Sequence, residues 1–296
     1  MRPIRHHSRS SSAPLVLHDM SGRTVIVTGA SSGIGRAAAE SLSRAGANVV
    51  LAVRDVAKGQ AVASTFAGRA EVRRLDLEDL ASVRAFADGW TGEIDVLINN
   101  AGIMQVPLGR TADGFERQIG TNHLGHFALT NLLLPFITGR VVTVSSNAHA
   151  RGRLDLDDLQ WQRRPYQSGQ AYSDSKLANL VFTLELDRRL TLAGSHVRAI
   201  AVHPGMVRTG LFDHATGFQA AMIDVIGRLL LADPAQGAQT TLFAALADVP
   251  GGSFVQPSGA AHLRGHPAVS RGTRAAYDEA LGRDLWALSA SLTSAT

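Results

Sequence analysis

The alternation of short apolar runs with longer helical segments constrains this chain more than any other feature. It starts at residues 24–28 (TVIVT) and continues into the last third of the sequence. Such alternation is typical of βαβ units, which build a parallel sheet. The runs are almost continuously apolar, as expected of strands that helices cover on both faces. The sequence therefore predicts a doubly wound α/β sheet of about seven parallel strands with helices on both faces.

The boundaries of the elements follow from where each apolar pattern starts and stops. Strands are predicted at residues 24–28, 48–53, 71–75, 94–99, 141–145, 197–202 and 253–255. Helices are predicted near residues 34–45, 57–66, 80–90, 114–137, 172–192 and 234–247. No repeat or shift in composition divides residues 21–290, so residues 21–296 are predicted to form a single domain.

Composition excludes several classes of protein. The 296 residues include no cysteine, which rules out a disulfide scaffold, a zinc–thiolate site and a cysteine nucleophile. The net charge of +4 is weak support for a nucleic-acid partner, and we expect none. No apolar run is long enough to cross a membrane, so no membrane span is predicted and the cytoplasm is the expected location.

The first 20 residues differ from the rest, since they are rich in arginine and serine. We interpret residues 1–20 as a flexible basic arm. The same composition fits an organellar transit peptide or a nucleic-acid-binding arm less well, because the local positive charge is small.

A glycine-rich segment, TGASSGIG at residues 28–35, follows the first predicted strand and opens the first predicted helix. Its glycines (Gly29, Gly33 and Gly35) permit a tight turn, and a helix N-terminus offers free N–H groups to a diphosphate. The spacing is Gly-x3-Gly-x-Gly, so a purely structural turn is the alternative. The position between strand and helix favours dinucleotide binding.

The end of the second predicted strand selects between dinucleotides, because an acidic residue there would bind a ribose 2′-hydroxyl. Val53 and Arg54 stand at that place, and Arg54 favours a 2′-phosphate. Arg36 offers a second cation. A surface pair between Arg54 and Asp55 is the alternative reading, and we predict NADP(H) in preference to NAD(H).

A second group of residues indicates acid–base chemistry. Tyr172 and Lys176 are four residues apart within a predicted helix and so share one face. A cation beside the phenol is expected to lower the pKa of Tyr172 from about 10. Ser146, at the end of a strand, is placed to donate to a substrate carbonyl oxygen, with Ser145 as the alternative.

Two further features have competing readings. Residues 208–232 are strongly apolar and form either ordinary buried helices or a lid over a hydrophobic substrate. His123, His126 and His149 lack acidic or thiolate partners at ligand spacing, so we predict no metal site.

The ordered motifs resemble the short-chain dehydrogenase/reductase family over about residues 21–290. They are TGASSGIG, Asp76-Leu77, Asn99-Asn100-Ala101-Gly102, Thr121-Asn122-His123, Ser146, Tyr172-x3-Lys176 and His203-Pro204-Gly205. The segments TNHLGHF and YSDSKLANLVF are most similar to its retinol-dehydrogenase-like branch and bacterial relatives. The resemblance implies a Rossmann-type fold and an NAD(P)-dependent enzyme.

The resemblance also implies roles for individual residues. Tyr172 would be the general acid/base and Ser146 would polarise the carbonyl. Lys176 would bind the nicotinamide ribose and depress the pKa of Tyr172, and Asn122 would hold a water chain leading to Lys176. Cofactor contacts are implied at Gly29, Ser31, Ser32, Gly33, Ile34, Gly35, Arg54, Asp76, Leu77, Asn99, Ala101, Gly102, Tyr172, Lys176, Pro204, Gly205, Val207 and Thr209.

The predicted substrate is a hydrophobic alcohol, aldehyde or ketone. A homodimer or homotetramer is expected from the resemblance, packed partly through the helices that hold Asn122 and Tyr172. A catalytically silent NADP(H)-binding sensor or scaffold on the same fold is the alternative function, although such proteins usually lack the Tyr–Lys pair.

Overall fold

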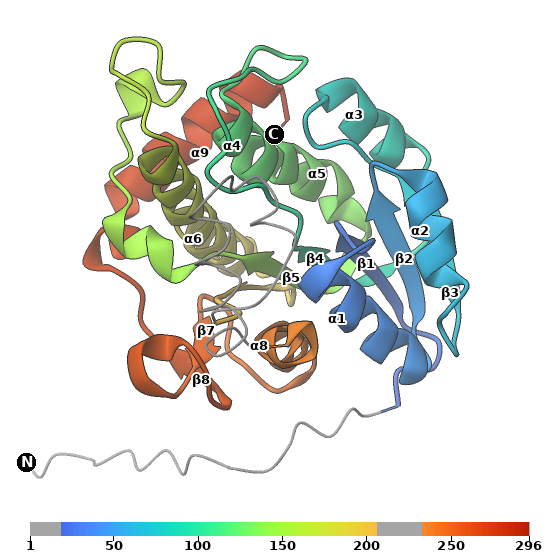
Figure 1. The fold of residues 1–296 in the computed structure, drawn as a ribbon. Helices are drawn as coiled ribbons and strands as arrows, with labels where there is room; N and C mark the ends of the chain where they lie inside the picture. Colours follow the sequence, from blue (N-terminus) through green and yellow to red (C-terminus); the bar gives the residue numbers. More distant parts are fainter. Residues whose placement is uncertain (1–18, 206–232, 296) are drawn as a thin grey trace, which may run out of the picture.

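The computed structural model describes residues 19–205 and 233–295, which fold around one sheet (Figure 1). The sheet has eight strands in the order β3-β2-β1-β4-β5-β6-β7-β8. Their bounds are β1 Thr24–Thr28, β2 Asn48–Val53, β3 Ala70–Arg74, β4 Ile94–Asn99, β5 Ile137–Val144, β6 Arg198–Val202, β7 Phe254–Pro257 and β8 Pro267–Ser270. All pairs are parallel except β7 and β8, which are antiparallel.

Helices cover both faces of the sheet (Figure 1). One face packs against α1 (Gly33–Arg44), α2 (Val56–Ala63) and α8 (Pro234–Leu246). The other packs against α3 (Leu80–Asp88), α5 (Gly125–Leu133) and α6 (Ser168–Leu192). The strands between them are almost wholly buried, which explains their continuous apolar runs. This arrangement confirms the predicted doubly wound fold.

The sheet is one strand larger than predicted. Strand β8 was missed because Pro267–Ser270 has no apolar run, and Val269 on it is 54% exposed. An edge strand has only one neighbour and need not be apolar on both faces. The seven predicted strands are parallel to one another, and the additional strand β8 pairs with β7 in an antiparallel hairpin at this edge.

The helix predicted at residues 114–137 is divided in the structure. It consists of α4 (Arg117–Ile119), one π-helical turn η1 (Gly120–Leu124) and α5, and Ile137 already belongs to β5. π-Helical turns inserted in α-helices occur frequently at functional sites. This one contains Asn122.

The C-terminal helix α9 (Glu279–Thr293) was also not predicted, and it packs on α5 and α6. Trp286 stacks on Phe182, with 5.8 Å between ring centroids, and meets the edge of Phe127 at 5.0 Å. Ser289 Oγ is 2.8 Å from His123 Nε2. Helix α9 therefore lies against the two helices through which a second copy was expected to pack.

Two sequence predictions concern segments beyond these ranges. The basic arm lies almost entirely outside the described residues, and residues 208–232, read as a lid, lie wholly outside them. Among the residues that the structure does describe, no helix combines the length and apolar character needed to span a membrane.

Candidate active site

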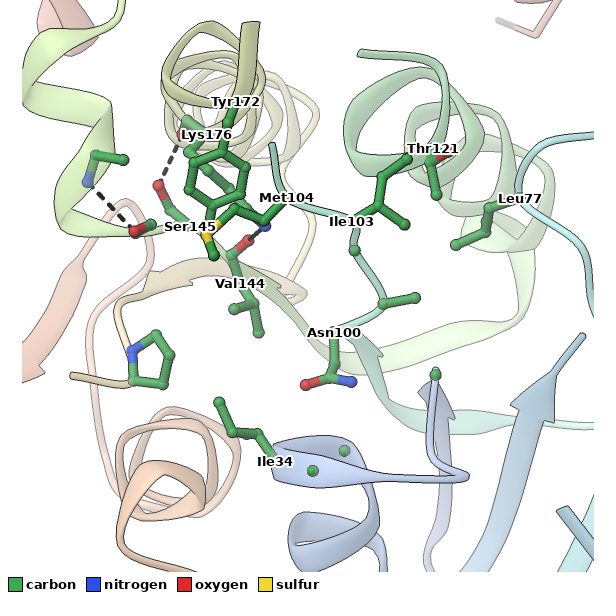
Figure 2. Close-up of a pocket in the computed structure, with 18 of the residues that line it drawn as sticks. Ile34, Leu77, Asn100, Ile103, Met104, Thr121, Val144, Ser145, Tyr172 and Lys176 are labelled. Carbon is green, nitrogen blue, oxygen red and sulfur yellow. Dashed lines mark hydrogen bonds between the residues drawn. The ribbon is translucent and has the colours of Figure 1, made fainter. Parts of the chain in front are cut away.

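A cavity of about 1020 Å³ opens at the carboxyl ends of the parallel strands. The residues that follow β1, β2, β4, β5 and β6 all line it: Gly29, Arg54, Asn100, Ser145 and His203. The strand order reverses between β1 and β4, and ligands of doubly wound sheets bind at such a point. Figure 2 shows Tyr172 and Lys176 on one side of this cavity and Ile34 and Asn100 on the other.

The glycine turn is shaped for close backbone approach. Gly29 has φ +67°, and a Cβ there would lie 2.9 Å from Ala101 Cα. A Cβ on Gly35 would lie 2.4 Å from Asn100 Nδ2. Ser32 caps α1 without a side-chain hydrogen bond, and the first turn of α1 has no acidic residue. The free N–H groups and the positive end of the helix dipole therefore fit the diphosphate of a nucleotide.

Two consecutive asparagines at the end of β4 face opposite ways, and only Asn100 lines the cavity. Asn99 is 1% exposed, and its Nδ2 donates to Thr130 Oγ1 (2.8 Å) inside the core. Asn100 faces the cavity instead and donates to the carbonyl of Thr28 (2.8 Å). The Asn99 side chain does not line the cavity, because side chains alternate between faces along a strand, and its contact with the nucleotide stays a prediction. Ala101 and Gly102 line the cavity as predicted.

The rim near β2 carries the cations that would select a phosphate. Arg54 lines the cavity and its Nη1 lies 3.8 Å from Glu78 Oε1, beyond hydrogen-bond range. The Asp55 carboxylate caps α2 by accepting from Lys58 N (2.9 Å), and the carboxylate that lies within ion-pair distance of Arg54 is that of Glu78. Asp76 and Leu77 line the same end of the cavity.

One cation at this rim was assigned wrongly from the sequence. Arg36 is exposed on α1 and does not line the cavity, whereas Lys58 does. The signal for Lys58 was available, since it stands four residues after Arg54. The sequence predicted a helix near residues 57–66, but not that its first turn places Lys58 at the rim of the cavity.

Tyr172 and Lys176 project from α6 into the cavity, as their spacing predicted (Figure 2). Lys176 Nζ lies 5.7 Å from the centroid of the Tyr172 ring and donates to Val144 O (3.1 Å). Burial lowers the pKa of Lys176 from 10.5 to about 8. Burial raises the pKa of Tyr172 above its ordinary value of 10.0, and a hydrogen bond with the Ser146 side chain opposes that rise. The predicted lowering of the Tyr172 pKa is therefore wrong for the chain by itself.

The two serines after β5 have different surroundings. Ser145 is 2% exposed, and its hydroxyl donates to the carbonyl of Lys176 (2.7 Å). Ser146 faces Tyr172 and accepts from Ala148 N (3.2 Å). The hydroxyl of Ser146 thus remains at the reacting end of the cavity, while that of Ser145 holds α6 against β5.

Asn122 acts as a brace behind the cavity wall. Its Oδ1 accepts from Ile103 N (2.8 Å), and its Nδ2 donates to Ile103 O and to Ser175 Oγ (both 2.9 Å). Ser175 precedes Lys176, so this side chain ties the β4 loop to the helix of the Tyr–Lys pair. Pro204 and Gly205 line the cavity, and Val207 and Thr209 lie outside the described residues.

The lining of the cavity includes polar residues that the sequence did not indicate. Its lining includes Gln105, Arg151, Gln167 and Gln170, together with Met104. None of these was predicted, because they come from loops and helix ends with no recognisable pattern. The three histidines considered as metal ligands bond elsewhere: His123 to Ser289, His126 to Thr28, and His149 to the carbonyl of Ser146.

The comparisons with known proteins agree with this geometry. Residues 23–219 match the short chain dehydrogenase family. The chain is 44% identical to human retinol dehydrogenase 13, covering 92% of this chain and 84% of that protein. It is 48% identical to human retinol dehydrogenase 11, covering 77% of this chain and 74% of that protein.

Solved structures show the same relationship. A crystal structure of an uncharacterized protein from Mycobacterium paratuberculosis has a TM-score of 0.82 at 52% identity, covering 94% of this chain and 96% of that one. The RhlG/NADP active-site complex of Pseudomonas aeruginosa has a TM-score of 0.66 at 25% identity, covering 83% and 98%. By its fold and these matches, the chain belongs to the short-chain dehydrogenase/reductase family as an NAD(P)-dependent enzyme acting on CH–OH groups.

Proposed function

We propose that this chain is an NADP(H)-preferring oxidoreductase for hydrophobic alcohols, aldehydes or ketones, with Tyr172 as general acid/base. The observation that carries the proposal is the convergence of Ser146, Tyr172 and Lys176 on one wall of the cavity that also contains the glycine turn. Ser146, Tyr172 and Lys176 suit a substrate carbonyl oxygen. The glycine turn suits the diphosphate of the nucleotide.

When bound, the nicotinamide supplies or accepts the hydride. The hydroxyls of Ser146 and Tyr172 donate to the substrate oxygen as negative charge develops on it. Tyr172 gives its proton to that oxygen during reduction and takes one back during oxidation. Lys176 keeps protons beyond the one donated to Val144, so it can bind ribose hydroxyls and stabilise the Tyr172 phenolate by its charge.

The remaining predicted cofactor contacts belong to different parts of the nucleotide. The glycine turn (Gly29, Ser31, Ser32, Gly33, Ile34 and Gly35) would hold the diphosphate. Asp76 and Leu77 would contact the adenine, and Ala101 and Gly102 the adenosine ribose. Pro204, Gly205, Val207 and Thr209 would contact the nicotinamide carboxamide.

The preference for NADP(H) would come from Arg54 and Lys58 at the rim. We expect Arg54→Ala to weaken NADPH binding about 10- to 100-fold, because a charge-assisted bond to the 2′-phosphate is lost. NADH binding should change less than twofold. Fluorescence titration of both nucleotides measures the effect, with Arg36→Ala as the matched control outside the cavity. Equal affinity of the unaltered protein for NADPH and NADH would contradict the preference.

The names of the relatives direct the search for a substrate. Retinol dehydrogenases 11 and 13 suggest a panel that starts with retinal and includes other hydrophobic aldehydes and ketones. We expect NADPH oxidation by at least one of them. Tight NADPH binding without turnover would favour the sensor or scaffold alternative, and no binding of either nucleotide would refute the proposal. The homodimer or homotetramer and the cytoplasmic location stay predictions.

A further inference from the structure

A buried histidine connects the two halves of the site. His126 is 1% exposed and lies at the start of α5. Its Nδ1 is 3.0 Å from the main-chain oxygen of Asn122, and its Nε2 is 2.9 Å from Thr28 Oγ1. The proposed chemistry does not use this ring, yet both of its nitrogens are hydrogen-bonded to residues next to the site.

The partners determine where the ring proton resides. A carbonyl oxygen only accepts, so Nδ1 carries the proton and donates to Asn122. Nε2 is then an acceptor, and the Thr28 hydroxyl donates to it in preference to Ile98 O, which is 3.4 Å away. The Thr28 oxygen in turn accepts from Asn100 N and Ala101 N (both 2.9 Å). The Thr28 hydroxyl therefore donates to His126 and accepts from two main-chain N–H groups, of which Asn100 N also lies 3.0 Å from Ile98 O.

Each bond of His126 leads to a different part of the site. Thr28 immediately precedes Gly29, and Asn100 and Ala101 line the cavity. On the other side, the Asn122 side chain bonds Ser175, the neighbour of Lys176. The imidazole thus joins the end of β1 and the loop after β4 to the π-helical turn and, through it, to α6.

We propose that His126 is a positioning residue with two separable functions. Its Nε2 bond to Thr28 holds the nucleotide-binding turn, and its Nδ1 bond to Asn122 holds the turn that braces Lys176. The second of these functions, at Asn122 and Lys176, rests on the proposed oxidoreductase activity.

Two substitutions of His126 each keep one of its two hydrogen bonds and remove the other. In His126→Asn, the short amide can donate to Asn122 O but cannot accept from Thr28, whose hydroxyl then has only the longer contact to Ile98 O (3.4 Å). In His126→Gln, the longer amide can accept from Thr28 but does not reproduce the Nδ1 geometry. We expect His126→Asn to weaken NADPH binding about tenfold with kcat nearly unchanged at saturation. We expect His126→Gln to lower kcat about tenfold with the NADPH Kd nearly unchanged.

His123→Asn is the matched control. His123 is equally buried three residues earlier, but its Nε2 bonds Ser289 of α9, away from the cavity. Its replacement should lower the melting temperature and leave the NADPH Kd and kcat within twofold. If both His126 variants lose affinity and kcat in one fixed ratio, or change only the melting temperature as His123→Asn does, His126 is a packing residue and the proposal fails.

A measurement on the unaltered protein is independent of activity and of the stability of the variants. Nitrogen-15 NMR of the imidazoles should show His126 with its proton on Nδ1, and the other tautomer would overturn the inference. If the protein turns over no carbonyl compound, the proposed function fails by itself. In that case the NADPH Kd values of His126→Asn and His126→Gln still test whether the bond to Thr28 holds the nucleotide-binding turn. Equal Kd values for the two variants would refute that function.

Discussion

At the scale of single residues, burial and local hydrogen bonds decide which polar groups are available for chemistry. Ser145 and Ser146 are neighbours, but the hydroxyl of Ser145 donates to the Lys176 carbonyl whereas that of Ser146 bonds Tyr172. Tyr172 is 9% exposed, and its pKa is raised mainly by burial. If Tyr172 is the proposed acid/base, a positive charge on Lys176 would have to lower this pKa.

Tyr172→Phe should abolish turnover while the NADPH Kd stays within about twofold, since only the proton donor is removed. Steady-state kinetics and fluorescence titration measure the two quantities. More than a few per cent of residual activity would refute Tyr172 as the acid/base.

Ser146→Ala should lower kcat by about 100-fold, because one of two donors to the developing oxyanion is lost. Ser145→Ala is the paired control. It should cost about 1 kcal/mol of stability through the lost bond to Lys176 O and leave a larger share of kcat. The reverse order of kcat values would move the catalytic function to Ser145.

At the scale of elements, helix α9 closes the face formed by α5 and α6. Trp286 contacts Phe127 and Phe182, and the Arg189 guanidinium lies 4.3 Å from the Trp286 ring centroid. A helix that covers this face inside one chain competes with any second copy for the same surface. The expected oligomer must therefore displace α9 or use another surface.

Trp286→Ala should lower the free energy of unfolding by about 2 to 4 kcal/mol, because a large ring at a helix interface is lost. Urea unfolding measures the change. The NADPH Kd of the folded variant should be unaltered, since Trp286 does not line the cavity. A change in sedimentation from the unaltered protein would show that α9 controls assembly.

At the scale of the whole molecule, buried histidines link stability to pH, because burial lowers the pKa of His123, His126, His149 and His203. Burial lowers the pKa of His123 and His203 to about 3 and that of His126 to about 4. Their unfolded pKa is about 6.5, so the unfolded chain binds more protons between pH 6.5 and these values. Stability is therefore lost as the pH falls through this range.

The free energy of unfolding should fall by about 1 to 2 kcal/mol per histidine between pH 7 and pH 5, and these groups should add no slope above pH 7.5. Urea titrations at several pH values test this expectation. His123→Asn should remove the contribution of one histidine to this change. Equal stability at pH 5 and pH 7 would show that these rings are not held neutral.

The local elements could be read from the sequence because their signals are local. The bounds of β1, β2 and β4 agree with the predicted ranges, and the glycine turn is in its predicted place between β1 and α1. Apolar runs mark buried strands and glycines mark positions where a side chain would collide, as at Gly29. The spacing of Tyr172 and Lys176 follows in the same way from the period of a helix.

The features that the sequence could not determine depend on contacts between distant residues. Strand β8 depends on pairing with β7 and has no apolar run of its own. Helix α9 does have a local pattern, with Asp278 as N-cap and leucines at helical spacing (Leu281, Leu285, Leu288 and Leu292), but only the structure shows that it packs on α5 and α6.

The sequence by itself determined the doubly wound fold, the nucleotide-binding turn and the Tyr–Lys pair, because each depends on residues close together in the chain. Only the tertiary structure decided that Asn100 rather than Asn99 faces the cavity, that the Tyr172 pKa is raised, and that His126 joins Thr28 to Asn122. The direction in which a side chain points, its burial and its hydrogen-bond partners are properties of the packed molecule, and no local pattern of residues encodes them.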